Sequence, residues 1–309
     1  MSMRAILFPG QGAQAVGMGR DLAEAIPECR DLFNKASQVL GFDLAKVCFE
    51  GPIEDLTKSS NAQPAIFVAS LACQAALRRA QPALNFASAA GLSSGEWTAL
   101  HMAGVVSFED TLRILEARGR FMQEACEEQP GAMLSIIGLD LPALEKVAAE
   151  AGVQIANLNS PEQTVLSGPK GGIEKAEPIA KAAGAKKAIR LNVSGAFHSS
   201  LMNSAARRLS AVLSQISFQA PQIPVMSNVT GKPHETPDSI RRLMVEQVTS
   251  SVQWVACVRA IQALGVRSYV ECGPGKVLSG LVRRIDKEAS IHNISDLPSA
   301  EAAGTALNS

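Results

Sequence analysis

The chain has 309 residues, and its 29 Lys and Arg side chains balance 29 Asp and Glu, so the formal net charge is zero. This balance argues against a nucleic-acid or membrane-surface partner, because both kinds of partner require a basic face. With 47% hydrophobic but only 4% aromatic residues, the composition favours an α/β protein of one large domain or two smaller ones.

The first four residues lead directly into an apolar segment, without the hydrophobic region of a signal peptide. No run of 18 or more apolar residues occurs, so we expect no transmembrane helix and a cytoplasmic protein. Six cysteines are widely spaced, with no C-x-x-C pair and no neighbouring histidine. They predict reduced thiols and no metal site.

A short apolar segment, residues 4–8, precedes a glycine-rich loop that contains Gly10, Gln11 and Gly12. The spacing fits a dinucleotide-binding loop, but the helical pattern that follows continues to Gly41 and leaves no place for the second strand of such a unit. Two interpretations remain open. The loop is either a tight strand-to-helix connection, or it lets the Gln11 N–H approach a ligand oxygen.

The segment 88–104 has the composition of a nucleophile elbow. An apolar strand ends in Gly-Leu-Ser-Ser-Gly, and a helical pattern follows at once. Gly91 and Gly95 lie two residues on either side of Ser93, which leaves room for a sharp turn that presents the serine at a helix N-terminus. The N–H groups there favour a developing oxyanion. Such motifs also occur by chance in small-residue turns, so the motif alone leaves the role of Ser93 open.

A helix is predicted from Ser107 to about Cys126. Arg113 and Arg120 each follow a glutamate by four residues, whereas Arg118 has apolar neighbours at three and four residues on both sides. The Arg118 guanidinium therefore either reaches solvent or binds an anionic ligand in a pocket. Gln63 lies beside the proline that begins an earlier apolar helix and could face a pocket, but a residue in this place is more often a cap or surface residue.

Residues 130–197 show a β-α-β-β-α-β order, which is typical of a ferredoxin-like fold and predicts an inserted small domain. The large α/β domain then comprises residues 1–129 and 198–309. Its last predicted strand is 268–272, and residues after about 299 are expected to form a frayed tail.

Among the four histidines, His198 is the best partner for Ser93, because it lies where a strand reaches a loop before a new helix. A structural histidine remains the alternative. His101 is eight residues beyond Ser93 on the same helix and too far away to touch it. His234 and His292 lie in polar segments and are predicted at the surface. No short acidic motif supplies a third member of a triad.

Six ordered motifs together resemble the malonyl-CoA:acyl carrier protein transacylases over nearly the whole chain. They are GQGAQ (10–14), GLSSGE (91–96), EARGRFMQEA (116–125), NLNSPEQTVLSG (157–168), GAFHSSLM (195–202) and ECGPGKVLSGL (271–281). The resemblance implies an α/β-hydrolase-like large domain with a parallel sheet and an inserted ferredoxin-like small domain. It implies a serine acyltransferase that moves a malonyl group from malonyl-CoA to acyl carrier protein, for fatty-acid or polyketide synthesis, without a cofactor.

The resemblance also implies roles for particular residues. Ser93 is the nucleophile, His198 the general base, and the backbone N–H groups of Gln11 and Ser94 form the oxyanion hole. Arg118 binds the free carboxylate of the malonyl group.

Three further positions follow from the same resemblance. The backbone carbonyl of Gln247 orients the histidine in place of an acid. Asn159 matches a polar position of the site. Phe197 is bulky enough to crowd an α-methyl branch, which favours malonyl over methylmalonyl.

Two positions depart from the family pattern, in which a histidine commonly precedes the nucleophile and an apolar residue follows it. Here these residues are Leu92 and Ser94. Two rival functions stay open, and the Leu92 change supports only the second of them. The first is a serine hydrolase, which would have no need of Arg118, and the second is a catalytically weak binding or scaffolding homologue. We expect a monomer, given the zero net charge and the lack of an evident apolar patch.

Overall fold

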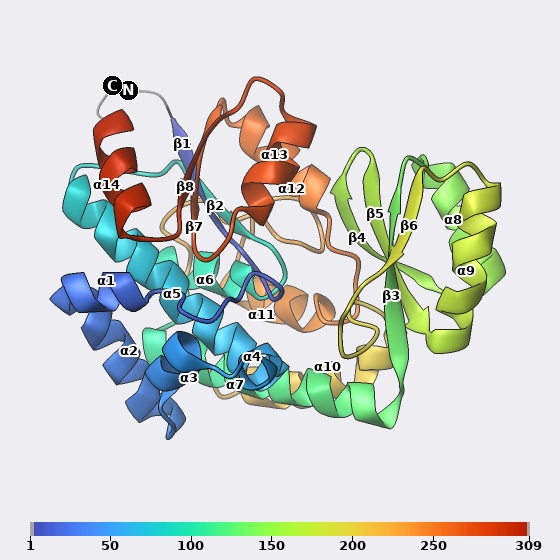
Figure 1. Ribbon diagram of the computed structural model, residues 1–309, viewed down its shortest axis with the longest axis horizontal. Helices are drawn as coiled ribbons and strands as arrows, with labels where there is room; N and C mark the ends of the chain where they lie inside the picture. Colours follow the sequence, from blue (N-terminus) through green and yellow to red (C-terminus); the bar gives the residue numbers. More distant parts are fainter. Residues whose placement is uncertain (1–2, 308–309) are drawn as a thin grey trace.

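Two four-stranded sheets organise the protein in a computed structural model, which describes residues 3–307 (Figure 1). The first sheet is parallel, with the strand order β2-β1-β7-β8, and the second is antiparallel, with the order β4-β5-β3-β6. The strands are β1 (Arg4–Phe8), β2 (Ser88–Gly91), β3 (Gly131–Ile137), β4 (Gln154–Ser160), β5 (Gln163–Pro169), β6 (Lys187–Arg190), β7 (Ser268–Cys272) and β8 (Ser290–Ile294).

Helices connect and cover these strands. In the first half of the chain they are α1 (Arg20–Ala25), α2 (Pro27–Leu40), α3 (Leu44–Glu50), α4 (Ile53–Thr57), α5 (Ser59–Ala80), α6 (Gly95–Met102) and α7 (Phe108–Glu128). In the second half they are α8 (Leu141–Ala151), α9 (Lys170–Ala182), the short 3-10 helix η1 (Ser200–Met202), α10 (Asn203–Leu213), α11 (Pro237–Glu246), α12 (Trp254–Ala263), α13 (Val277–Ile285) and α14 (Leu297–Ala306). Among residues 3–307, no helix combines the length and apolar character that crossing a membrane requires.

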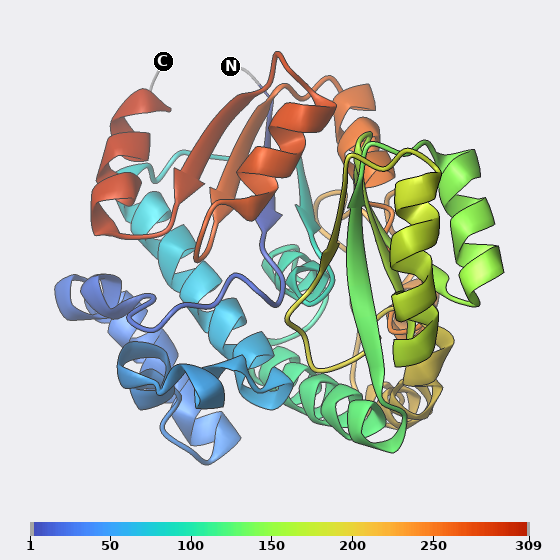
Figure 2. The same ribbon diagram turned by 45° about the vertical axis from the view of Figure 1, so that its right-hand side comes forward.

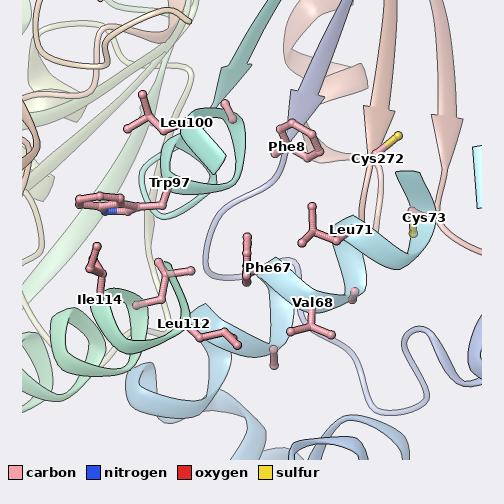
Figure 3. Close-up of a cluster of buried hydrophobic side chains, with 14 of the residues drawn as sticks. Phe8, Phe67, Val68, Leu71, Cys73, Trp97, Leu100, Leu112, Ile114 and Cys272 are labelled. Carbon is pink, nitrogen blue, oxygen red and sulfur yellow. The ribbon is translucent and has the colours of Figure 1, made fainter. Parts of the chain in front are cut away.

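The parallel sheet is buried on both faces, as the apolar strands predict. Alternate residues of β1 belong to different hydrophobic clusters, because successive side chains of a strand point to opposite faces. Ile6 and Phe8 pack with α5, α6 and α7, while Ala5 and Leu7 pack with α12 and α13. Figure 3 shows the first cluster, with Trp97 between α6 and α7. The carboxyl ends of β1 and β2 are thereby held rigidly.

The antiparallel sheet has its helices on one face. Helices α8 and α9 cover the outer side of the sheet, and the other side faces the rest of the protein (Figure 2). The element order β3-α8-β4-β5-α9-β6 is ferredoxin-like. Backbone hydrogen bonds from Leu158 N to Val252 O (2.9 Å) and from Val252 N to Ala156 O (2.8 Å) connect β4 to the segment before α12. The expected combination of a parallel sheet and a ferredoxin-like sheet is confirmed.

Helix α7 begins where the sequence predicts it, because the Ser107 hydroxyl accepts a hydrogen bond from the Asp110 N–H at 3.1 Å. The expected frayed tail is wrong. Residues 297–306 form α14, whose first turn is held by a capping box between Asp296 and Ser299, and the helix packs against α5 (Figure 1).

Helices α5 and α7 cross at Gly119 with their backbones in contact. A Cβ atom at Gly119 would lie 2.2 Å from the Ser59 carbonyl oxygen. We expect Gly119→Ala to lower the free energy of unfolding by about 1–3 kcal/mol, because two helix backbones must separate to admit the methyl group. Urea denaturation followed by circular dichroism measures the loss.

Gly280 in α13 is the matched control, since a Cβ atom there would have no neighbour within 4 Å. Gly280→Ala should stabilise the protein by up to about 1 kcal/mol through helix propensity. Equal effects of the two alanines would contradict the close crossing at Gly119.

Candidate active site

The strand β2 and the helix α6 meet in a turn that holds Ser93 in a left-handed conformation, with φ of 54°. Both flanking glycines are required there. A Cβ atom at Gly91 would lie 1.9 Å from the Gly95 carbonyl oxygen, and one at Gly95 would lie 2.2 Å from Phe8 O. The Ser93 N–H donates to the Asn228 side-chain oxygen at 2.7 Å. The turn therefore has the strained geometry of a nucleophile elbow.

His198 lies beside the serine, as expected. Its Nε2 is 2.9 Å from Ser93 Oγ, and its Nδ1 is 2.8 Å from the Gln247 carbonyl oxygen. A carbonyl oxygen can only accept, so a neutral His198 carries its proton on Nδ1 and offers Nε2 as the acceptor for the serine hydroxyl. Like the serine, His198 adopts a left-handed backbone, with φ of 57°.

The imidazole of His198 is buried and remains neutral over a wide range of pH. Its pKa is lowered from 6.5 to about 4, mainly by burial and further by the nearby positive charge of Arg118. Hydrogen bonds to the backbone of Gln247 and Ser250 act in the opposite direction. The ring is therefore a proton acceptor at neutral pH.

The guanidinium of Arg118 is turned into the protein and is 1% exposed. Its Nη1 donates to Gln63 Oε1 at 2.8 Å, and its Nη2 donates to Gln247 Oε1 at 3.0 Å and to Ser93 Oγ at 3.1 Å. Its Nε is buried without an acceptor among the described residues. Burial lowers the pKa of Arg118 to about 10, a change opposed by the charge of Glu96, so the side chain stays positive at neutral pH.

The alternative in which the Arg118 guanidinium reaches solvent is wrong, because the side chain is buried. The interpretation of Gln63 as a cap or surface residue is wrong, because its side chain is buried and holds Arg118. The pattern around Gln63 is local to α5 and contains no information about the partner on α7.

The two amides expected to form an oxyanion hole lie in different environments. The Gln11 N–H donates to the hydroxyl of Ser94 at 3.2 Å. The Ser94 N–H has no acceptor in the described part of the chain. The Gln11 side chain is fixed separately, by donation to Ser59 Oγ at 2.9 Å. The Ser94 N–H is thus free, whereas the Gln11 N–H is engaged by the Ser94 hydroxyl. In the family pattern described above, the residue at this position is apolar and has no such hydroxyl.

A cavity of about 420 Å³ opens over these groups and is lined by Ser93, Arg118 and His198 together with Phe197 and Asn159. A second cavity of about 360 Å³ adjoins it and shares Asn159, Gln11 and Leu92 with the first. The Asn159 Oδ1 is buried and has no partner among residues 3–307. Both cavities lie between the two sheets.

Three residues behind the serine were not assigned to the site from the sequence: Glu96, Asn228 and His234. All are at most 5% exposed. His234 was predicted at the surface, which is wrong, because its Nε2 is 2.6 Å from Glu96 Oε1. The polar composition of its loop indicated exposure. The fold instead turns the loop back through a hydrogen bond from His234 N to Val225 O at 2.8 Å.

All six cysteines lie within the described residues, where they are buried and form no disulfide. Residues 3–307 bring no group of three or more His, Cys, Asp or Glu side chains together in a way that could hold a metal ion.

The Ser93 hydroxyl is hydrogen-bonded to an imidazole whose other nitrogen is held by a backbone carbonyl, and the free Ser94 N–H lies beside it. Serine-dependent acyl-transfer sites have this arrangement. Residues 6–307 match the family model of the acyl transferase domain. The chain belongs to this family and is an acyltransferase. The family resemblance inferred from the six motifs is confirmed.

Individual relatives match nearly the whole chain. It is 43% identical to the malonyl CoA-acyl carrier protein transacylase of Escherichia coli strain K12, over 99% of this chain and 100% of that protein. An acyl carrier protein S-malonyltransferase from Vibrio cholerae has a TM-score of 0.94 at 42% identity, over 98% of this chain and 100% of that chain. A malonyl-transacylase in complex with a type II polyketide acyl-carrier protein has a TM-score of 0.95 at 40% identity, over 99% and 100%.

The low pKa of His198 predicts how reactivity at Ser93 depends on pH. Protonation of Nε2 removes the proton acceptor, so the rate of Ser93 labelling by phenylmethylsulfonyl fluoride should stay constant from pH 8 to about pH 5. It should fall to half near pH 4. Ser93→Ala is the control for labelling at other sites. A half-maximal rate near pH 6.5, the ordinary value for histidine, would contradict this assignment.

Proposed function

We propose that this acyltransferase moves the malonyl group of malonyl-CoA to the phosphopantetheine thiol of acyl carrier protein. The observation that carries the proposal is the buried Arg118, whose charge faces the serine and whose hydrogen-bond partners among residues 3–307 are all neutral. A substrate with a free carboxylate at the end of its acyl group would supply the missing anion. The similar proteins carry names that specify this reaction.

In the first half of the reaction, Ser93 Oγ attacks the thioester carbon and its proton passes to His198 Nε2. The oxyanion is stabilised by the Ser94 N–H, and by the Gln11 N–H once the Ser94 hydroxyl gives it up. The carbon–sulfur bond then breaks, and the proton on His198 passes to the sulfur of CoA. A malonyl ester of Ser93 remains.

In the second half, the carrier thiol gives its proton to His198 and attacks the ester carbon. The bond to Ser93 Oγ breaks, and the serine recovers the proton from His198. Gln247 O holds the Nδ1 proton of the ring through both halves, so that Nε2 always faces the serine. The reaction therefore needs no cofactor or metal beyond the substrates.

The same geometry supports a route for the pantetheine arm. The second cavity joins the first beside Gln11, Leu92 and Asn159. We assign it to the arm of CoA or of the carrier protein, with the free Asn159 Oδ1 as an acceptor for an amide N–H. The acyl group lies in the first cavity, where Phe197 limits room for an α-methyl branch. In this assignment residues 130–197 form a small domain that covers the site of the large domain. We also propose that the enzyme is a cytoplasmic monomer.

Two variants test the proposal by intact-protein mass spectrometry after brief mixing with malonyl-CoA or acetyl-CoA. Ser93→Ala should form no adduct. Arg118→Ala should reduce the preference for malonyl over acetyl by about 10- to 100-fold, because a charge-assisted pair is lost only with malonyl.

Adding acyl carrier protein to the malonyl adduct completes this test. Transfer of the label to the carrier is expected, whereas loss to water at the same rate with or without the carrier would favour the hydrolase. No adduct on the unmodified enzyme would favour a binding or scaffolding homologue and would overturn the proposal.

The hydroxyl of Ser94 competes with the oxyanion for the Gln11 N–H, so its removal should accelerate acylation. We expect Ser94→Ala to raise the rate of malonyl adduct formation by about 2- to 10-fold, the equivalent of one neutral hydrogen bond. Rapid-quench mass spectrometry measures the rate. Ser59→Ala is the matched control, because it removes the bond to the Gln11 side chain and leaves the backbone N–H unchanged. A slower Ser94→Ala enzyme would show that the hydroxyl supports the loop.

A further inference from the structure

A cluster of buried polar side chains lies behind the nucleophile, on the side away from the cavity: Glu96, Asn228, His234 and Gln247. Each is at most 5% exposed. None of the first three lines the cavity that holds Ser93 and Arg118. Any effect of this cluster on the reaction therefore acts through the residues it holds.

Glu96 is the centre of this cluster. Its Oε1 accepts from His234 Nε2 at 2.6 Å, and its Oε2 accepts from the Asn228 N–H at 3.0 Å and from Gln247 Nε2 at 2.6 Å. Each carboxylate oxygen thus has a donor, and His234 supplies the only one to Oε1 among residues 3–307. Loss of that donor would leave one oxygen of a buried carboxylate unpaired.

The side chain of Gln247 separates this carboxylate from the buried guanidinium. Its Nε2 donates to Glu96 and to the Ser93 carbonyl oxygen (3.0 Å), while its Oε1 accepts from Arg118 Nη2 at 3.0 Å. Glu96 and Arg118 are near enough for their charges to interact, but no direct ion pair forms between them. The guanidinium is kept available for another anion.

We infer that His234 is a positioning residue for malonyl selectivity, an inference that rests on the function proposed above. Its Nε2–H holds Glu96 Oε1 on the far side of the carboxylate. Without this donor, the unpaired oxygen turns toward the nearest buried cation, Arg118, and competes with the malonyl carboxylate. Acetyl transfer does not use the guanidinium to bind an anion, so it is affected much less.

The test compares two amides at position 234. In His234→Gln the side-chain nitrogen can occupy the place of Nε2 and donate to Glu96, whereas the shorter His234→Asn cannot reach it. The preference for malonyl over acetyl, measured by mass spectrometry of the Ser93 adduct, should be retained in His234→Gln. It should fall by about tenfold in His234→Asn, through a higher KM for malonyl-CoA.

His101→Gln is the control for loss of another imidazole. His101 lies on the same helix as Glu96, but its Nδ1 contacts Val106 O at 2.9 Å and its ring packs on Phe67 and Phe108. This variant should lower the melting temperature and leave the preference unchanged.

The outcomes separate this inference from the proposed function. An unmodified enzyme that forms no malonyl adduct overturns the function. An enzyme that forms the adduct, but whose malonyl preference is the same in His234→Asn and His234→Gln, overturns the role of His234. Equal losses of malonyl and acetyl transfer in His234→Asn also overturn it, because they indicate a structural role alone.

Discussion

The burial of one positive charge, that of Arg118, is the constraint on which the site depends. An isolated buried charge is costly unless hydrogen bonds and counter-charges compensate it. Here two glutamine side chains and the serine hydroxyl accept hydrogen bonds from the guanidinium. Glu96 contributes its negative charge at a distance, from the far side of Gln247. This arrangement stabilises the charged guanidinium without pairing it directly with a carboxylate. A direct carboxylate partner would occupy the place that an anionic substrate needs.

The two side chains that react in the proposed mechanism both stand on strained backbone. Ser93 and His198 are the only non-glycine residues with positive φ in the described chain, and such conformations cost on the order of 1–3 kcal/mol each. The surrounding structure compensates this cost. Asn228 binds the Ser93 N–H, and its side-chain nitrogen donates to Gly91 O at 2.8 Å, so one amide spans the turn. These hydrogen bonds therefore hold the serine in its strained conformation before substrate arrives.

The sequence predicted those features whose cause is local. The two glycines around Ser93 predicted the elbow, the missing acidic partner of Arg118 indicated an unusual arginine, and the strand order of residues 130–197 predicted the ferredoxin-like sheet. The errors concern residues whose environment depends on distant segments. Gln63 is buried because α7 packs against it, and His234 is buried because α6 does. The local pattern at the start of an apolar helix, or in a polar loop, does not show which helix will pack there. The capping box formed by Asp296 and Ser299 was a local signal for α14. It was missed because the small polar residues around it were interpreted as a frayed tail.

In the proposed mechanism, the charge of Arg118 also links the choice of substrate to the strength of His198 as a base. A histidine with a pKa of about 4 is a weak acceptor for a serine proton, and two causes keep it weak: burial first, and then the positive charge of Arg118. A carboxylate bound to the guanidinium would cancel the second cause and raise the pKa of His198 toward the range in which a general base works best. An acetyl group would bring no such charge. Malonyl selectivity would then arise in the transition state as well as in binding, because the substrate that neutralises Arg118 also strengthens the base that activates Ser93.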